Sequence, residues 1–347
     1  MKPFLPLAVL LCAAFAGCAA SGPATTTPAA PATLLERTAA NVPALQFNAT
    51  AGVQWWSDFA QTYTFRNAFA PSNAAARDHI AAGLAAAGLH VRIRLYPASA
   101  FGPALPATAG PLFVSVVEAT KPGRDDRTIA LGAHYDNTAA ATVQAAYDNG
   151  AGTATLYNLC TALAKLPTPT QHTFTCLFFD GEELGLVGSQ AYVADTTHPV
   201  PDAYLGFDMT GLNWPGIDTT LPGNAQWKLY AWTGAEFADA LYPFLNGTLH
   251  QVLGYPLAGA EAFPFNDRNS DEASFADAHV PTLRFAGGRT AGLYPQYHKP
   301  GDTVDYVYQF AGSRERFEQG MAAVRTAWQV ALQLDQTSLD ELKAAYR

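Results

Sequence analysis

The sequence contains few charged residues and few cysteines. Asp, Glu, Lys and Arg together make up 14% of the 347 residues, the formal net charge is −9, and no stretch is rich in Lys or Arg. An acidic chain without a basic block is a poor candidate for binding nucleic acid. The four cysteines form no CxxC pair and no Cys/His cluster, which excludes a zinc site built on thiolates. No internal repeat is visible.

Residues 1–18 predict an export signal with a lipid attachment site. Lys2 precedes an apolar stretch from Leu5 to Phe15 that is too short to span a bilayer. The stretch ends in FAGC, which resembles a bacterial lipobox with cleavage before Cys18 and a lipid on its sulfur, although Phe15 stands where leucine is usual. A plain signal peptide cut nearby is the alternative. We expect an exported protein, periplasmic or in the cell envelope, that acyl chains on Cys18 hold at a membrane surface.

The rest of the chain divides into a tether and one domain. Residues 19–46 begin with a run of little but Ala, Pro and Thr, which predicts a disordered tether. We interpret residues 47–347 as a single domain, long enough to bury a large core. Within it, Cys160 and Cys176 can pair in an oxidising compartment, but the sequence does not give their separation in space.

Apolar runs and helical periodicities alternate along the domain. Strands are predicted at residues 91–95, 112–118, 128–133, 174–179, 203–207 and 282–286. Helices are predicted at residues 72–87, 156–166, 190–193, 237–249, 314–334 and 339–346, and residues 212–226 predict a loop rich in Gly and Pro. The alternation predicts an α/β protein, a three-layer α/β/α sandwich around a mostly parallel mixed sheet. In such a sheet, ligands bind in the crevice outside the carboxyl ends of the strands.

The run HTFTCLFFDGEELGLVGS, residues 172–189, predicts a buried strand that ends at Asp180 with two glutamates behind it. Glu182 and Glu183 are adjacent carboxylates beside an apolar strand, an arrangement that is costly unless each has a partner. One of them can bind a metal ion while the other carries a proton. A surface turn with two glutamates is the alternative if no other site residue meets them.

Further candidates follow neighbouring strands or the loops between them. His134 is followed by Asp136, and metal-bound histidines usually donate their second N–H to a carboxylate. Asp148 precedes a helix, and Asp208 ends an apolar strand, where a carboxylate needs a partner. His298 follows the last predicted strand, so we expect all of these side chains at one edge of the sheet.

Two imidazoles and three carboxylates are nitrogen and oxygen donors that suit zinc. The candidate ligands are His134, Asp148, Glu183, Asp208 and His298. Five are too many for a single catalytic tetrahedral zinc, which uses three protein ligands and a water. If one carboxylate bridges, they suffice for two ions roughly 3.5–4 Å apart.

In order, HYD, YDNGAG, FFDGEELGLVGS, FDM and YHKPGDT resemble the motifs of the di-zinc aminopeptidases of the bacterial leucyl aminopeptidase type, a family of zinc exopeptidases. The resemblance covers roughly residues 50–335, and GEELGLVGS is its most specific part. It implies the zinc-exopeptidase fold and two Zn2+ ions per chain. One zinc would be held by His134, Asp148 and Asp208, and the other by Asp148, Glu183 and His298, with Asp148 bridging.

The same resemblance implies the chemistry. Glu182 would be the general base and Asp136 the support for His134. The implied activity is removal of amino-terminal residues from peptides through a metal-bridging water, whose proton Glu182 takes and then returns to the leaving amine. A free α-amine can bind the second metal directly, which favours action at the amino terminus. The chain departs from the family pattern at Tyr147, where a second acid often stands, and at Glu272, where Ser-Asp-His is common; the second departure leaves substrate preference open.

Two other functions stay open. A glutaminyl-cyclase-like transferase is similar to this chain at HYD, at the bridging aspartate, at the two glutamates and at the last histidine, but it typically operates with one zinc. A metal-free binding module on the same fold would have lost ligands, and none of the five is missing. Trp214, Tyr294 and Tyr297 either line a pocket for an apolar substrate side chain or only pack in the core.

Overall fold

The computed structural model describes residues 42–98, 112–138, 144–211, 230–234, 263–265, 270–286, 294–321 and 323–344. The expectations for residues 1–41, which include the export signal, the lipid on Cys18 and most of the tether, lie outside the described residues. The expected helix at 237–249, the expected loop at 212–226 and Trp214 also lie outside them. Among the helices that are described, none is long and apolar enough to cross a membrane.

Eight strands of the described residues form one mixed sheet. In spatial order they are β1 (His90–Pro97), β2 (Phe113–Lys121), β4 (Thr173–Phe179), β3 (Thr128–His134), β5 (Ala203–Phe207), β8 (Thr282–Ala286), β6 (Tyr230–Gly234) and β7 (Phe263–Phe265). The four central strands β4, β3, β5 and β8 pair in parallel. On either side of these four strands the pairing is antiparallel: β2 pairs with β4, and β6 pairs with β8.

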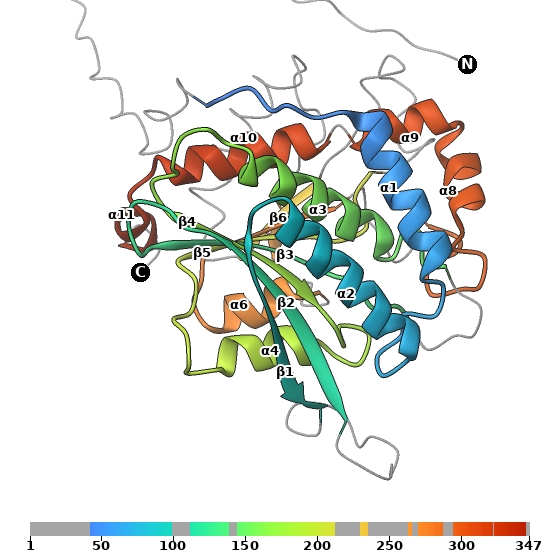
Figure 1. Cartoon of the computed structure of the whole chain (residues 1–347), viewed down its shortest axis with the longest axis horizontal. Helices are drawn as coiled ribbons and strands as arrows, with labels where there is room; N and C mark the ends of the chain where they lie inside the picture. Colours follow the sequence, from blue (N-terminus) through green and yellow to red (C-terminus); the bar gives the residue numbers. More distant parts are fainter. Residues whose placement is uncertain are drawn as a thin grey trace, which may run out of the picture. The chain divides into compact units, whose positions relative to one another are not determined.

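Helices cover both faces of the sheet. One face contacts α2 (Pro71–Ala86), α3 (Gly150–Ala164) and α10 (Ala323–Asp335), and the other contacts α4 (Val187–Ala194) and α6 (Glu272–Asp277). In Figure 1, α3 and α10 lie above the sheet, and α4 and α6 lie below it. The predicted three-layer α/β/α sandwich around a mostly parallel sheet is therefore confirmed.

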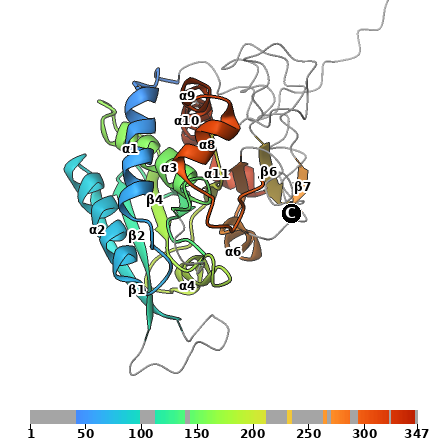
Figure 2. The same cartoon turned by 90° about the vertical axis from the view of Figure 1, so that its right-hand side faces the viewer.

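Three further helices pack against one another beside the start of α3 (Figure 2). They are α1 (Ala49–Thr62), α8 (Val304–Ala311) and α9 (Arg314–Met321). Asn48 caps α1 by accepting a hydrogen bond of 3.1 Å from the backbone N–H of Ala51, which supplies one of the partners that the first turn of a helix lacks. The short helix α11 (Leu339–Ala344) follows α10.

Strand β4 shows why the centre of the sheet is buried. Phe174 and Phe178 belong to a core cluster that also contains Leu159 of α3. Leu177 belongs to a second cluster, which contains Phe275 of α6. Successive side chains of a strand point to opposite faces, so a continuous apolar run predicts a strand that is covered on both sides.

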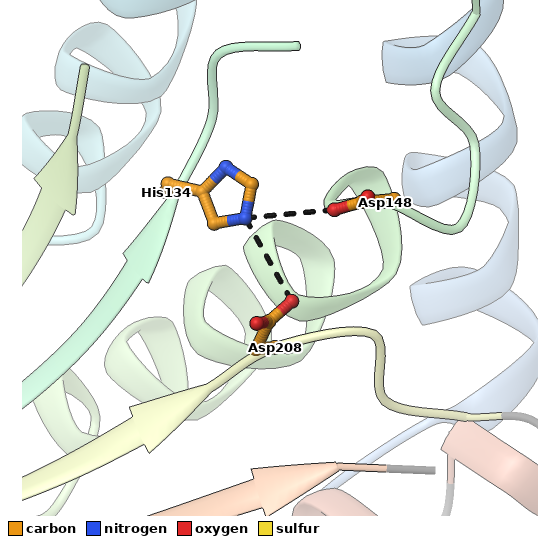
Figure 3. Close-up of side chains that lie close together, drawn as sticks. All are labelled: His134, Asp148 and Asp208. Carbon is orange, nitrogen blue, oxygen red and sulfur yellow. Dashed lines mark ion pairs between the residues drawn. The ribbon is translucent and has the colours of Figure 1, made fainter. Parts of the chain in front are cut away.

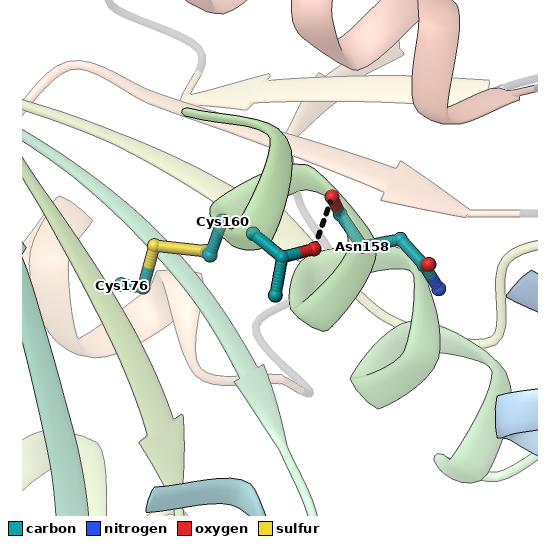
Figure 4. The surroundings of a disulfide bond; sticks show 4 residues. Asn158, Cys160 and Cys176 are labelled. Carbon is teal, nitrogen blue, oxygen red and sulfur yellow. Dashed lines mark hydrogen bonds between the residues drawn. A yellow bond between two sulfur atoms is a disulfide. The ribbon is translucent and has the colours of Figure 1, made fainter. Parts of the chain in front are cut away.

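A disulfide joins Cys160 of α3 to Cys176 of β4, with an S–S distance of 2.00 Å (Figure 4). The pair that the sequence left open is thus bonded in the structure. The first residue of α3 comes two residues after Asp148, and β4 ends four residues before Glu183. The covalent link therefore connects two elements that lie next to candidate ligands in the sequence.

The helices differ from the sequence predictions more than the strands do. The expected long helix at 314–334 is two helices, α9 and α10, and Gly320, a residue of low helix propensity, lies near their boundary. Helices α1, α6 and α8 are additional to the predicted ones. The predicted strands at 203–207 and 282–286 agree residue for residue with β5 and β8.

Candidate metal centre

The parallel strands bring three predicted site segments to one edge of the sheet. His134 is the last residue of β3 and pairs in register with Phe179, the last residue of β4. Glu182 and Glu183 follow β4 after a turn, and Asp208 directly follows β5. Because neighbouring parallel strands end on the same side, these side chains meet there although they are far apart in sequence.

The first group of possible ligands consists of His134, Asp148 and Asp208. The Nε2 atom of His134 lies 3.6 Å from Oδ1 of Asp148 and 3.7 Å from Oδ1 of Asp208. Figure 3 shows the imidazole turned toward both carboxylates, one at the start of α3 and one after β5.

The second group consists of Asp148, Glu183 and His298. The Nε2 atom of His298 lies 3.2 Å from Oδ2 of Asp148 and 3.3 Å from Oε2 of Glu183. Asp148 therefore belongs to both groups and presents a different carboxylate oxygen to each histidine. That arrangement is what a bridging ligand requires.

The spacing of these atoms fits metal ions. Two ligands that each lie about 2.1 Å from a tetrahedral zinc are about 3.4 Å apart, close to the distances measured in both groups. Glu183 Oε1 and Asp208 Oδ1 are buried and have no hydrogen-bond partner within the described part of the chain. Buried carboxylate oxygens without partners are costly, so a cation would satisfy a need that the protein leaves open.

The model of Peptidase family M28 matches residues 115–323, which is more than half of the chain. The chain belongs to peptidase family M28. All of the candidate ligands in both groups lie inside the matched region.

Two curated relatives of this M28 chain are aminopeptidases by name. It is 26% identical over 202 residues to aminopeptidase YwaD of Bacillus subtilis, covering 56% of this chain and 39% of that protein. It is 34% identical over 205 residues to leucine aminopeptidase 1 of Coccidioides posadasii, covering 54% of this chain and 50% of that protein. The chain spans half or less of the length of these relatives.

Two solved structures share the fold of this M28 chain. BSAP, a zinc aminopeptidase from Bacillus subtilis, superposes with a TM-score of 0.65 at 15% identity, covering 88% of this chain and all 100% of that one. A glutaminyl cyclase from Bacteroides thetaiotaomicron superposes with a TM-score of 0.63 at 16% identity, covering 84% and 98% of the two chains. At these identities the likeness shows the fold alone, and the fold accommodates both activities.

Asp136 connects the histidine of the first group to the glutamates. Its Oδ1 lies 3.4 Å from His134 Nδ1. Its carboxylate also accepts hydrogen bonds from the backbone N–H groups of Glu182 at 3.3 Å and Glu183 at 3.2 Å. Asp136 is itself fully buried, so its carboxylate lies between the imidazole and the turn after β4.

Glu182 lies beside the ligand groups without joining either. Its Oε2 is 3.9 Å from His134 Nε2. Among the described residues, Glu182 is nevertheless a member of neither group of possible metal ligands. Burial raises the pKa of Glu182 well above its usual value. A carboxyl group with a raised pKa next to a metal centre can exchange protons near neutral pH.

Burial and crowding also shift the pKa values of other ionisable groups at this site. Burial raises the pKa of Glu183 to about 8. Burial acts to lower the pKa of His134, but the charge of Glu182 and the nearby carboxylates of Asp136 and Asp208 outweigh it and raise that pKa well above its usual value. Metal binding requires neutral imidazole and ionised carboxylate, so loading of this site should release protons.

Asp302 and Asn149 make hydrogen bonds beside the candidate ligands, and the sequence predicts no role for either of them. Asp302 accepts hydrogen bonds of 3.0 Å from the backbone N–H groups of Tyr147 and Asp148. The Oδ1 atom of Asn149 accepts from Gly152 N at 2.9 Å, which caps α3, and from the residue after Asp208 at 3.0 Å. Asn149 thereby links the two aspartates of the first group.

The sequence holds a signal for each of these two residues. Asn149 immediately precedes a glycine-rich helix start, where asparagine is a preferred cap. Asp302 is part of the YHKPGDT motif, four residues after His298. Their position beside the candidate ligands depends on contacts with distant parts of the chain. The local sequence pattern therefore does not predict which groups these two side chains contact.

The two departures from the expected motifs have structural partners. Glu272 Oε1 accepts a hydrogen bond of 3.0 Å from Arg284 Nη1, and both side chains are buried. Glu272 therefore forms an ion pair with β8 and belongs to neither ligand group. The ring of Tyr147 is buried against that of Tyr294, with centroids 4.8 Å apart.

The sequence did not decide whether Tyr294 and Tyr297 line a substrate pocket or pack in the core. In the structure the two tyrosines have different surroundings. Tyr294 is buried, and its hydroxyl donates a hydrogen bond of 2.8 Å to Asp302, which indicates a packing role. The ring of Tyr297 stacks on that of His298 with centroids 3.8 Å apart. Since the side chain of His298 is 42% exposed, Tyr297 borders the open side of the second group.

Proposed function

We propose that this protein is a two-zinc aminopeptidase that removes amino-terminal residues from peptides. The observation that carries the proposal is the pair of three-residue ligand groups that share Asp148. Membership of family M28 and the aminopeptidase names of both curated relatives support it. A bridged pair of ligand groups favours a peptidase over a glutaminyl cyclase, which typically operates with one zinc.

The metal centre would be held by the five predicted ligands, His134, Asp148, Glu183, Asp208 and His298. When bound, zinc supplies Lewis acidity, which polarises a carbonyl and lowers the pKa of a water molecule. Glu182, whose Oε2 lies 3.9 Å from His134 Nε2, would take a proton from the attacking water at its carboxylate and return that proton to the leaving amine. Asp136 keeps both the His134 ring and the Glu182 backbone in position.

The direct test removes the proposed base and leaves the ligands intact. In Glu182→Ala, we expect an unchanged zinc content and fold, with a loss of turnover of about 10²–10⁴-fold, the usual contribution of general acid–base catalysis. Zinc content and hydrolysis of aminoacyl and dipeptide substrates would be measured side by side. Glu315→Ala, at an exposed position, is the matched control. Wild-type turnover in Glu182→Ala would overturn the assignment of the base.

A peptide with amino-terminal glutamine separates the peptidase from the cyclase. The proposed function predicts release of the free amino acid. Release of ammonia with the peptide chain otherwise intact would identify a glutaminyl-cyclase-like transferase instead. Both products can be followed in one reaction by mass spectrometry.

We also propose that the chain is exported and held at a membrane surface by a lipid on Cys18, with residues 19–46 as a tether to a domain at 47–347. The disulfide between Cys160 and Cys176 supports export, because disulfides persist in oxidising compartments. Expression of the full chain in a bacterial host that lipidates proteins should place it in the membrane fraction. Cys18→Ser should move it to the soluble fraction, and continued membrane association of that variant would contradict lipid anchoring.

A further inference from the structure

The segment that leads into Asp148 is held on its carbonyl side by buried donors. The guanidinium of Arg66 donates to the carbonyl oxygens of Gln144 and, at 2.6 Å, of Ala145. The indole N–H of Trp56 donates to the next carbonyl, that of Ala146, at 2.5 Å. Three consecutive carbonyl groups are therefore fixed by side chains from α1 and from the loop that follows it.

The same segment is held on its N–H side by a buried acceptor. The two carboxylate oxygens of Asp302 accept from the backbone N–H groups of Tyr147 and Asp148, each at 3.0 Å. The backbone carbonyl of Asp302 accepts from Ala146 N at 3.2 Å. Residues 144–148 thus lie between the side chains of Arg66 and Asp302, each bound to main-chain groups.

Arg66 also reaches the segment that carries the first histidine. Its Nε atom donates to the carbonyl oxygen of Tyr135 at 2.7 Å, and Tyr135 lies between His134 and Asp136. One rigid guanidinium, whose donors have a fixed fork geometry, therefore sets the distance between the His134 segment and the segment before Asp148.

The burial of Arg66 calls for a function. The residue is 0% exposed, and in the described part of the chain it forms hydrogen bonds to backbone carbonyls rather than an ion pair. Burial lowers the pKa of Arg66 to about 10, so it is charged at neutral pH. The acidic groups that favour its charge are Asp302, Asp136, Asp148 and Glu183.

We propose that Arg66 and Asp302 form a clamp on residues 144–148 that sets the position of Asp148 relative to His134 before any metal binds. Both are positioning residues, because they act on Asp148 and His134 through main-chain hydrogen bonds. The inference rests on the proposed function in one respect, that Asp148 is the shared metal ligand. A bridging carboxylate has to present its two oxygens to two ions at once, so its backbone position matters more than that of a ligand to a single ion.

The test measures zinc affinity in variants that weaken the clamp. Asp302→Asn replaces one acceptor oxygen with an NH2 group that faces a backbone N–H. Arg66→Lys keeps the charge and loses the fork. Zinc dissociation constants would be measured by competition with a chromophoric chelator, together with kcat, KM and the urea midpoint in EDTA. Exposed positions provide the matched controls Asp126→Asn and Arg92→Lys.

We expect both clamp variants to bind zinc about 10- to 100-fold more weakly, the usual cost of losing a residue that orients metal ligands. We also expect a lower kcat with a nearly unchanged KM, and controls that match the wild type. A merely structural role would lower the urea midpoint and leave the zinc dissociation constants of the folded protein unchanged. Folded variants with wild-type zinc affinity would overturn the clamp.

Two further results keep the outcomes distinct. If Arg66→Lys is recovered only unfolded, Asp302→Asn decides alone by the same criterion. The zinc titration of the wild type tests the proposed function. If the wild-type protein does not bind zinc, both the metal centre and the clamp are overturned. Normal wild-type binding with unchanged variants would overturn the clamp and leave the proposed function standing.

Discussion

The two ligand groups share Asp148 but differ in their access to solvent. In the first group, the side chains of His134 and Asp208 are 2% and 17% exposed. In the second group, Glu183 is 9% exposed, whereas His298 is 42% exposed. The first histidine ends a central strand, and the second lies in a turn outside the sheet. The histidine of the first group is therefore part of the core of the fold, and the histidine of the second group is open to solvent.

This contrast in solvent exposure indicates that the two metal positions differ in how readily an ion or a substrate reaches them. A metal in the first group would be enclosed by residues whose positions the sheet fixes, so it should exchange slowly. A metal in the second group would be reached from the side of His298 and Tyr297, where a peptide amine can approach. We therefore expect the two ions to differ in affinity, although they share a ligand.

The largest expected effect comes from the shared ligand. Asp148→Ala removes one ligand from each group, so we expect zinc content to fall well below two per chain. Activity should fall by more than about 100-fold, the upper range for loss of a residue that merely orients a ligand. Metal analysis and peptide hydrolysis would be compared with those of Asp126→Ala, an exposed control. Two tightly bound zinc ions in Asp148→Ala would break the idea of a shared site.

The next effect should separate the two histidines. In EDTA, His134→Ala leaves buried carboxylates without their cationic partner, so we expect a loss of unfolding free energy of about 3 kcal/mol. His298→Ala changes an exposed side chain and should cost less than about 1 kcal/mol. Urea unfolding of both variants would measure the difference. Equal losses of unfolding free energy in the two variants would show that both histidines contribute equally to the stability of the fold.

Breaking the disulfide should affect both groups alike, since it joins α3 to β4. The double variant Cys160→Ala with Cys176→Ala opens a short loop, and we expect a loss of about 3 kcal/mol of unfolding free energy under oxidising conditions. The ratio of the two zinc affinities should stay the same. Urea unfolding with and without reductant gives the measurement, because reduction of the wild type should mimic the variant. A selective loss of one zinc ion would contradict this equal effect.

The last prediction is a dependence of stability on pH in the metal-free protein. Burial raises the pKa of Glu183, Asp180 and Asp271 to about 8 each, against ordinary values of about 4 in the unfolded chain. Between these values the folded state holds more protons than the unfolded state, so stability should fall as the pH rises from 6 toward about 8. Urea midpoints in EDTA at several pH values would show it. The zinc-loaded protein is the control and should show a flatter profile, and a metal-free midpoint that rises with pH would contradict the prediction.

The sequence predicts those site residues that follow strand ends better than those that support them. His134, Glu183 and Asp208 follow apolar runs of neighbouring parallel strands, so local pattern and the geometry of parallel sheets suffice to bring them to one edge. His298 lies in a turn, and its partnership with Asp148 came from the resemblance to a known family. Arg66 belongs to no predicted element, and a single arginine carries no local sign that it will be buried.

The fold shows the same division. Strands β5 and β8 agree with the prediction because each is a short segment that is buried along its whole length, with the one charged residue of β8, Arg284, paired to Glu272. Helix α1 was missed because its apolar residues share the segment with Gly and polar residues, and its buried face is defined by contacts with α3 and α9. Long-range packing decides such elements, and the local sequence does not contain it.

The most direct test of the shared metal centre is anomalous diffraction at the zinc edge from crystals of the zinc-loaded protein. We expect two peaks roughly 3.5–4 Å apart, both in contact with Asp148, one beside His134 and Asp208 and the other beside Glu183 and His298. A single peak, or two peaks of which only one contacts Asp148, would contradict the shared metal centre.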